Sequence, residues 1–376
     1  MRKVPVSPAI VGRVSAKTIR NRPGHLPLVT KGAIITASVV DALLRRGKTW
    51  VWVKDEIFPE FEADEVVSQE TREVLTTALG QIFRDAASPK KLNRERQEDL
   101  LSNAVRRLVE EVAANDDVVV NIGRVRAWDN YTFEHSVHVA TLATVIGKRM
   151  LMTDDQLVRL GTGAILHDLG KVTVPQEILH KPGPLTDEEF EIVKSHARNG
   201  WDMVHEGYQN IMPTSSIVIL QHHERLDGSG YPQGLKGDDI YIFSRITAVA
   251  DVLDAVRAER NYRRTYRPTE VLRIMLQDAG VRLDAAAVEI ALRHVSLVSA
   301  GEIVRLTNGQ LGMVTGLNVG EPLRPVVSVV ADDLDRAMPI EEMDLSGTSL
   351  QIADVLDEWP PAVLEQIKGA GGQIPH

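Results

Sequence analysis

The 376-residue sequence contains no cysteine. Disulfide bonds, thiolate nucleophiles and cysteine-ligated zinc sites are therefore excluded. Any bound metal ion has to be held by His, Asp or Glu. Disulfides belong to oxidising compartments, and a chain without cysteine suits a reducing one. We expect a cytoplasmic protein.

Long apolar runs are also missing. No uninterrupted apolar segment of the sequence approaches the ~20 residues that a membrane-spanning helix needs. The first residues, "MRKVPVSPAIVGR", carry basic side chains, but the prolines and Arg13 interrupt any apolar signal core. We expect neither a membrane partner nor a secretory signal.

Basic residues are fewer than acidic residues in this sequence. The chain has 43 Lys and Arg against 52 Asp and Glu, a net charge of -9, which argues against DNA, RNA or an anionic membrane as a partner. A local basic pocket remains compatible with this balance. Residues 257–267 hold five arginines and one glutamate, a local charge of +4.

The pattern along the chain predicts a mainly α protein with small β-rich ends. Short β-branched and aromatic segments characterise the start, helical periodicity dominates the middle, and an Asn308-Gly309 hairpin signal follows it. The predicted parts are a small β-rich N-terminal module (1–62), a helical connector (63–115), a helical bundle domain (116–295), a small C-terminal β domain (296–350) and a C-terminal tail (351–376).

Two helices of the middle region carry clear start signals. Thr153 with Gln156 and Thr186 with Glu189 each have the spacing of a capping box. Both are followed by amphipathic segments, "LVRLGTGAIL" and "FEIVKSHARNGWDMV". We expect a helix to begin at each position.

Histidines gather in the helical region, where eight of the eleven lie between positions 135 and 223. Helices packed around one core can aim such side chains at one point. An ionised aspartate that faces a core needs a counter-charge, which a divalent cation supplies. A single His-Asp pair is commonplace, but the joint pattern predicts a metal site. The candidate ligands are His135, His167, Asp168, His196, His222, His223 and Asp251.

A family resemblance rests on five segments. In order, they are "YTFEHSVHVATLA", "HDLGKVTVP", "KSHARNGWDMV", "HHERLDGSGYPQGLKGDDI" and "ITAVADVLDAVRAERNYR". Their succession resembles the HD-GYP domains, a bacterial branch of the HD-superfamily phosphohydrolases that hydrolyse cyclic di-GMP. The resemblance covers 116–295 and implies the HD-superfamily helical bundle.

The resemblance implies a centre of two divalent transition metal ions. By similarity, His135, His167, Asp168 and Asp251 form the basic HD site. A second site would take Asp168 as a bridge and the ligands His196, His222 and His223. Some family members hold a third metal through a Glu where this chain has Tyr131. The family suggests iron or manganese, and nitrogen and oxygen ligands also suit Ni, Co or Zn.

The implied reaction is hydrolysis of a phosphodiester. A hydroxide that bridges the two ions would attack phosphorus and open cyclic di-GMP to linear pGpG, with further hydrolysis to GMP left open. Asp168 and Lys171 are the catalytic candidates. Lys171, four residues after His167, resembles the family lysine that reaches a phosphate oxygen, a task that suits a compact ammonium group.

Further residues are candidates for substrate contact. Matched to the family, Tyr231, Arg260 and Arg263 fall where guanine or phosphate is bound, and arginine forks suit both. Asp254, one turn beyond Asp251, is expected to orient a ligand or Arg260.

Two other functions stay open. The chain could act on another cyclic dinucleotide or a nucleotide monoester with the same ligand set. It could also be a sensor that binds cyclic di-GMP without cutting it, although such degenerate proteins usually lose ligands or the lysine. The terminal domains could form a homodimer or contact other signalling proteins, and nothing in them identifies an input signal.

Overall fold

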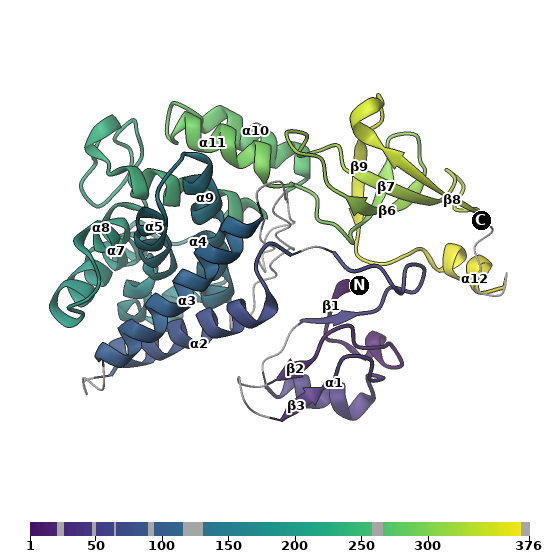
Figure 1. Cartoon of the computed structure of the whole chain (residues 1–376), viewed down its shortest axis with the longest axis horizontal. Coiled ribbons are helices and arrows are strands. Elements are labelled where there is room, and N and C mark those ends of the chain that lie inside the picture. Colours follow the sequence, from purple (N-terminus) through teal and green to yellow (C-terminus); the bar gives the residue numbers. More distant parts are fainter. Residues whose placement is uncertain are drawn as a thin grey trace. The chain divides into compact units, whose positions relative to one another are not determined.

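The computed structural model describes residues 1–20, 26–46, 50–63, 65–88, 94–115, 131–257 and 266–369. Two units make up the chain (Figure 1). One is built mainly from Met1–Glu65 and Arg293–His376, and the other from Val66–Val118 and Arg124–Leu292. The fold is mainly helical, with short N-terminal strands and a C-terminal antiparallel sheet, as the sequence predicts.

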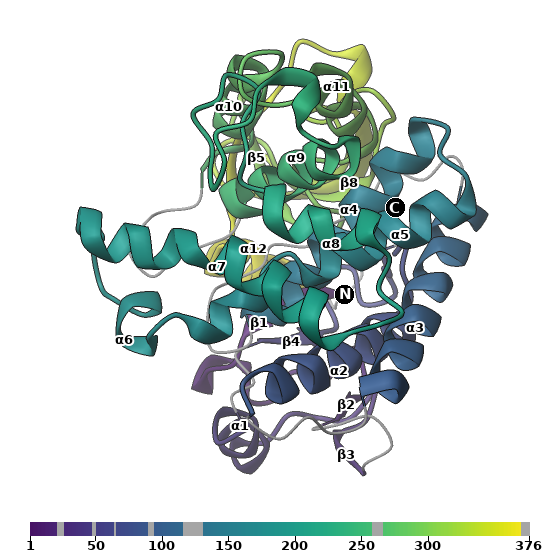
Figure 2. The same ribbon diagram turned by 90° about the vertical axis from the view of Figure 1, so that its left-hand side faces the viewer.

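The second unit is a helical bundle whose central helices α4, α5, α8 and α9 pack on one another (Figure 2). Short 3-10 turns follow α5 and precede α9, at Leu169–Thr173 and Gly237–Asp239. The helices are α2 (Gln69–Ala86), α3 (Arg94–Ala114), α4 (Tyr131–Arg149), α5 (Asp154–Leu166), α6 (Gln176–Leu179), α7 (Asp187–Gly207), α8 (Pro213–Gln221), α9 (Ile242–Arg257), α10 (Pro268–Asp278) and α11 (Ala285–His294).

Both predicted capping boxes are present. The Thr153 side chain accepts from the backbone N–H of Gln156, and the Gln156 side chain accepts from Thr153. Thr186 and Glu189 do the same at the start of α7. Each box satisfies two backbone donors that the first helical turn would otherwise leave unpaired.

A close backbone approach joins the end of α5 to α7. A Cβ atom on Gly170, in the 3-10 turn after α5, would overlap the carbonyl oxygen of His196. A Cβ atom on Gly200 of α7 would lie 2.8 Å from the backbone nitrogen of Gly170. Because neither position has room for a side chain, the segment after α5 lies directly on α7.

Helices α2 and α3 pack onto the bundle. Phe83 of α2 meets Phe133 of α4 edge to face, with ring centroids 5.1 Å apart. Glu98 of α3 is buried and accepts from the Asn210 backbone N–H at 3.1 Å and its side-chain amide at 2.9 Å. The helical connector therefore shares one unit with the bundle.

The first unit combines both ends of the chain. A five-stranded antiparallel sheet has the order β8-β7-β6-β5-β9, and the predicted Asn308-Gly309 hairpin joins β5 to β6. In the described residues of the N-terminal module, there are two two-stranded sheets and one α-helix. The elements are β1 (Arg2–Pro5), β2 (Ile19–Arg20), β3 (Pro27–Val29), α1 (Ala37–Leu44), β4 (Trp50–Val53), β5 (Ile303–Leu306), β6 (Leu311–Gly316), β7 (Val326–Ala331), β8 (Ala337–Asp344), β9 (Ile352–Leu356) and α12 (Pro361–Gly369).

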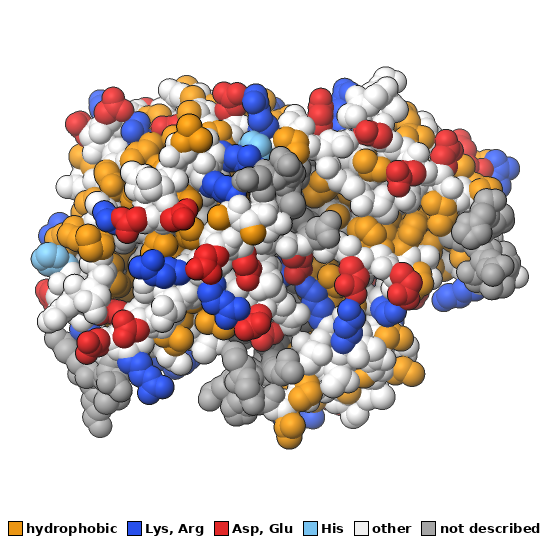
Figure 3. Space-filling model, viewed as in Figure 1, with side chains coloured by type: hydrophobic (Ala, Val, Ile, Leu, Met, Phe, Trp, Pro, Cys, Tyr) orange, Lys and Arg blue, Asp and Glu red, His pale blue; other side chains and the backbone are white. Residues whose placement is uncertain are grey.

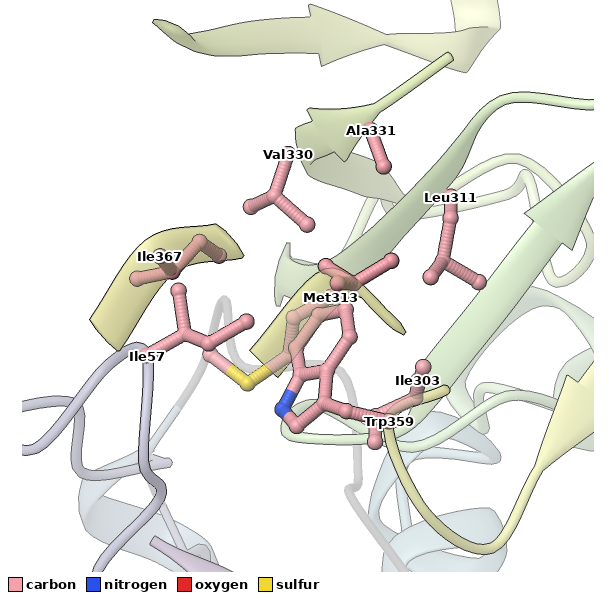
Figure 4. Packing of buried hydrophobic residues seen from close by; sticks show 9 residues of the cluster. Ile57, Ile303, Leu311, Met313, Val330, Ala331, Trp359 and Ile367 are labelled. Atoms are coloured by element: carbon pink, nitrogen blue, oxygen red, sulfur yellow. The ribbon is translucent and has the colours of Figure 1, made fainter. Parts of the chain in front are cut away.

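Residues 351–369 differ from the predicted tail, because they contribute β9 and α12. Strand β9 pairs with β5, and Trp359 and Ile367 pack against one face of the sheet (Figure 4). Ile57, from the N-terminal part of the chain, joins the same apolar cluster. The Trp359 indole N–H donates to buried Asp55 at 3.0 Å, which ties the two ends of the chain together.

Charged groups of both signs are interspersed on the face shown in Figure 3, with no broad basic area there. This distribution agrees with the negative net charge. Among the helices that the structure describes, none combines the length and apolar character needed to cross a bilayer.

Candidate metal centre

The structure brings all seven predicted metal ligands together inside the helical unit. His135 lies on α4, His196 on α7 and Asp251 on α9. The other four form two adjacent pairs, and each pair stands where a helix ends, α5 or α8. Two clusters result, each with ligand atoms within 4.8 Å of one another: His135, His167 and Asp251; and Asp168, His196, His222 and His223.

Asp168 lies between the two clusters. Its Oδ2 atom is 3.3 Å from Nε2 of His167 and 4.0 Å from Nε2 of His135. Its Oδ1 atom is 3.6 Å from Nε2 of His196 and 4.0 Å from Nε2 of His222. Each oxygen thus faces a different cluster, an arrangement that suits a carboxylate bridging two cations.

Backbone carbonyls set the orientation of three imidazoles. A carbonyl only accepts, so the Nδ1 atom that meets one carries the proton and Nε2 keeps its lone pair. This arrangement presents Nε2 to a metal ion, as outer-shell partners of ligating histidines usually do. The Nδ1–H donors and their acceptors are His167 to Ala164 at 2.7 Å, His196 to Val193 at 2.6 Å and His222 to Ile219 at 2.9 Å.

Two of these lone pairs face each other. Nε2 of His196 and Nε2 of His222 are 3.2 Å apart. Two acceptors at this distance repel unless a proton or a cation lies between them. Burial lowers the pKa of His196, and burial together with the neighbouring His223 and His167 lowers the pKa of His222 well below its usual value. Since a proton is disfavoured, a metal cation suits the pair.

Two further buried atoms are unsatisfied. Within the described part of the chain, Nε2 of His167 and Oδ1 of Asp168 have no hydrogen-bond partner. Each residue is only 1% exposed, so water does not readily compensate. Unpaired buried polar atoms cost about 1–3 kcal/mol each, and ligation would remove that cost. The donor set therefore fits divalent cations.

His135 has a carboxylate on each side. Its Nδ1 atom is 2.7 Å from Oδ2 of Asp254, and its Nε2 atom is 3.1 Å from Oδ1 of Asp251. Burial alone would lower the pKa of His135, but the bonds to Asp251 and Asp254 outweigh burial and raise it to about 10. Asp254 thus holds His135 in place, the positioning role that the sequence suggests.

His138, which is not among the candidate ligands, takes part in this arrangement. Its Nδ1 atom is 3.2 Å from the second oxygen of Asp254. One carboxylate therefore contacts two histidines one turn apart on α4. Asp254 lies on α9, which packs on α4 although it is 116 residues beyond His138 in the sequence.

The two candidate ligand aspartates have lowered pKa values despite burial. Burial raises the pKa of Asp168, but His167 and Lys171 outweigh this effect and hold it well below the usual value. The Lys171 ammonium lies 2.6 Å from Oδ2 of Asp168 and is 30% exposed. Burial likewise raises the pKa of Asp251, and His135 overcomes it. Lys171 therefore stands at the solvent side of the centre.

The Gly-Tyr-Pro loop covers one side of the histidines. The Tyr231 ring centroid lies 4.7 Å from that of His223 and 6.4 Å from that of His196. Burial, together with the charges of Asp168 and Asp251, raises the pKa of Tyr231, so its hydroxyl stays a proton donor.

Glu224 holds the loop around Gly230-Tyr231-Pro232 through hydrogen bonds to its backbone. Its carboxylate accepts from the backbone N–H groups of Gln233 at 2.7 Å and Leu235 at 3.0 Å. A Cβ atom on Gly230 would overlap the backbone of Glu224 and Arg225. The loop thus folds back on the residues that directly follow the histidine pair. The predicted substrate contacts Arg260 and Arg263 lie outside the described residues.

Comparison with family models finds two matches. A model described as an HD domain matches residues 95–287, slightly more than half of the chain. A model described as a KOW domain associated with the HD domain matches residues 303–360, which contain the five-stranded sheet.

Curated relatives match part of this chain. A cyclic di-GMP phosphodiesterase of Pseudomonas aeruginosa is 33% identical over 255 residues, 67% of this chain and 59% of the relative. A 3'3'-cGAMP-specific phosphodiesterase of Vibrio cholerae is 33% identical over 179 residues, 47% of this chain and 34% of the relative. The chain therefore spans between a third and three fifths of the length of these two relatives.

A solved structure has the same fold. It is titled as an HDG"Y"P protein from Bdellovibrio bacteriovorus and aligns with a TM-score of 0.50 at 14% identity, covering 77% of this chain and 98% of that one. With the HD-domain match and curated relatives that include cyclic di-GMP phosphodiesterases, the chain belongs to the HD domain family, in its HD-GYP branch.

Proposed function

We propose that the protein is a metal-dependent phosphodiesterase that hydrolyses cyclic di-GMP to linear pGpG. The observation that carries this proposal is the facing pair of Nε2 lone pairs on His196 and His222, beside the unsatisfied atoms of His167 and Asp168. Such an arrangement suits bound cations. Relatives named as cyclic di-GMP phosphodiesterases support the choice of substrate.

We assign one divalent ion to each cluster, with Asp168 as the bridge. When bound, two such ions supply Lewis-acid stabilisation of phosphoryl oxygens and a more acidic water. The nitrogen and oxygen donors suit iron or manganese, and also Ni, Co or Zn. His135, His167 and Asp251 would hold the first ion, and His196, His222 and His223 the second.

The remaining residues of the centre bind the substrate or orient a metal ligand. Lys171 provides a compact positive charge, 30% exposed, for a non-bridging phosphate oxygen. Tyr231 provides a protonated hydroxyl above His223. Asp254 keeps His135 oriented, and Arg260 and Arg263 are proposed contacts to guanine or phosphate.

A second substrate is favoured by one observation. Three of the relatives are named for 3'3'-cGAMP and are 33–35% identical to this chain, within the 25–38% range of those named for cyclic di-GMP. Equimolar competition between cyclic di-GMP and 3'3'-cGAMP, followed by chromatography of both products, distinguishes the two candidates.

We propose that 116–295 forms the catalytic domain and that the protein works in the cytoplasm. The compact unit that contains α2 and α3 suggests that 63–115 supports this domain. A homodimer, other signalling proteins as partners and further hydrolysis to GMP are proposals that sedimentation, pull-down and product analysis can test.

The decisive experiment pairs metal analysis with turnover on one sample. Protein purified without oxygen should carry about two transition metal ions and convert cyclic di-GMP to pGpG. Asp168→Ala should lose both bound metal and turnover. Asp202→Ala removes an exposed α7 carboxylate that pairs with Arg198, and should change neither. A metal-loaded wild type that leaves cyclic dinucleotides uncut refutes the proposal.

A further inference from the structure

An exposed aromatic ring stands beside the Gly-Tyr-Pro loop. Phe190, on α7, is 44% exposed. Its ring meets that of Tyr231 nearly edge to face, with centroids 6.2 Å apart and planes at 82°. Single exposed apolar side chains are common on protein surfaces, so the neighbours of Phe190 decide what this ring means.

One of those neighbours, Tyr231, connects Phe190 to the candidate metal centre. Tyr231 contacts Phe190 on one side and lies 4.7 Å from His223 on the other, between ring centroids. Phe190 precedes His196 by six residues on the same helix, about 9 Å along its axis at 1.5 Å per residue. The exposed ring therefore lies beside the candidate centre, within reach of a molecule that binds there.

A cation accompanies the two rings. The Lys194 ammonium lies 4.7 Å from the centroid of Phe190 and 5.9 Å from that of Tyr231. It also pairs with Glu191 at 2.5 Å, but Glu191 is 70% exposed. Since exposed ion pairs contribute about 0–1 kcal/mol, Lys194 can exchange this partner for a ligand at little cost.

We propose that Phe190 and Lys194, with Tyr231, form a subsite for one guanine base of the substrate. This inference rests on the proposed function and names residues that determine its specificity. The base stacks on the exposed face of Phe190. The Lys194 ammonium, which only donates, contacts the guanine edge through its O6 and N7 acceptors. Adenine presents an amino donor in place of O6, so Lys194 disfavours it.

The test uses the full chain with its metal and two single variants. Phe190→Ala should raise KM for cyclic di-GMP roughly 5- to 50-fold, the range for loss of one base–aromatic stack, with metal content unchanged and kcat little affected. Phe190→Trp should retain a low KM. Lys194→Met should lower the preference for cyclic di-GMP over cyclic di-AMP roughly 5- to 10-fold.

Ile192→Ala provides the matched control. Ile192 is an exposed apolar residue, 41% exposed, two positions further along α7 and therefore about 200° around the helix from Phe190. It should behave as wild type. A second readout, independent of turnover, is the equilibrium binding of a phosphorothioate analogue of cyclic di-GMP, whose affinity should fall by a similar factor in Phe190→Ala.

The outcomes separate the subsite from the reaction. An active wild type, together with unchanged KM and unchanged analogue binding in Phe190→Ala, overturns the subsite alone. Loss of kcat and metal in that variant also overturns it, because it indicates a structural role. A wild type that neither cuts nor binds cyclic dinucleotides overturns the proposed function itself.

Discussion

Replacing Asp254 by asparagine keeps the size of the side chain but removes the negative charge beside His135. The carboxylate lies 2.7 Å from Nδ1 of His135, and both side chains are at most 5% exposed. Loss of such a partner of a metal-ligating histidine typically costs 10–100-fold in metal affinity, or about 1.4–2.8 kcal/mol. We expect Asp254→Asn to weaken one metal site by this factor.

The loss should be confined to one ion. Asp254 contacts His135 of the first cluster. In the second cluster, His196 and His222 donate to backbone carbonyls, and His223 lies 4.0 Å from Asp251. Titration with a competing chelator, followed by elemental analysis, should show one ion released early and one retained. Release of both ions together at the wild-type concentration of chelator would contradict this division into two clusters.

A control separates the charge of Asp254 from general disturbance. His138→Ala removes the second histidine that contacts Asp254, at 3.2 Å, and leaves the bond to His135 intact. The variant should lose less than about fivefold in metal affinity, the effect of one ordinary hydrogen bond. An effect equal to that of Asp254→Asn would show that His138 itself has a larger role.

Three further predictions concern stability. Removal of metal by a chelator should lower the Tm of the helical unit in calorimetry and leave that of the sheet-containing unit unchanged. At a metal concentration 100 times its Kd, one bound ion contributes about 2.7 kcal/mol to the free energy of unfolding. Gly170→Ala should destabilise the helical unit and release metal, because its Cβ atom overlaps the His196 carbonyl. Asp55→Ala removes the carboxylate 2.6 Å from buried Arg2, which keeps Glu358 at 3.0 Å, and removes the acceptor of the Trp359 indole. It should cost about 1–3 kcal/mol in urea unfolding of the sheet-containing unit.

Local signals account for what could be predicted. The capping boxes at Thr153 and Thr186 depend on residues three positions apart, and both are present. The Asn308-Gly309 turn likewise carries its own conformational preference and joins adjacent strands. Candidate ligands were recognisable because neutral imidazoles and carboxylates on otherwise apolar helices need a partner.

Long-range pairing accounts for what could not be predicted. Strand β9 depends on β5, about 50 residues earlier, and on the apolar cluster around Trp359. The partner of Trp359, Asp55, lies 304 residues away in the sequence. No local pattern in 351–369 indicates these contacts, and the glycines at the end of the sequence, between 369 and 372, favour a tail. The position of Asp168 between the two clusters could not be predicted for the same reason, because the four histidines around it come from different helices: His135, His167, His196 and His222.

The two adjacent pairs of candidate ligands illustrate why helix ends suit such a centre. Within an α-helix, consecutive side chains point about 100° apart, so neighbours rarely face one site. His167 and His222 each close a helix, and the chain leaves helical geometry directly after them. Both adjacent side chains can then face inward. In addition, Nδ1 of each histidine donates to a carbonyl of the last helical turn, at Ala164 or Ile219.

This bond has two effects at once. It gives a carbonyl of the last helical turn a side-chain donor, and it turns the Nε2 lone pair toward the cluster. The partial negative charge of each helix C-terminus also favours a cation nearby. An apolar helix that ends in His-Asp is therefore stable when a cation binds at its end. The same reasoning applies to α8, which ends in His-His, so the two C-termini together favour positive charge in the centre.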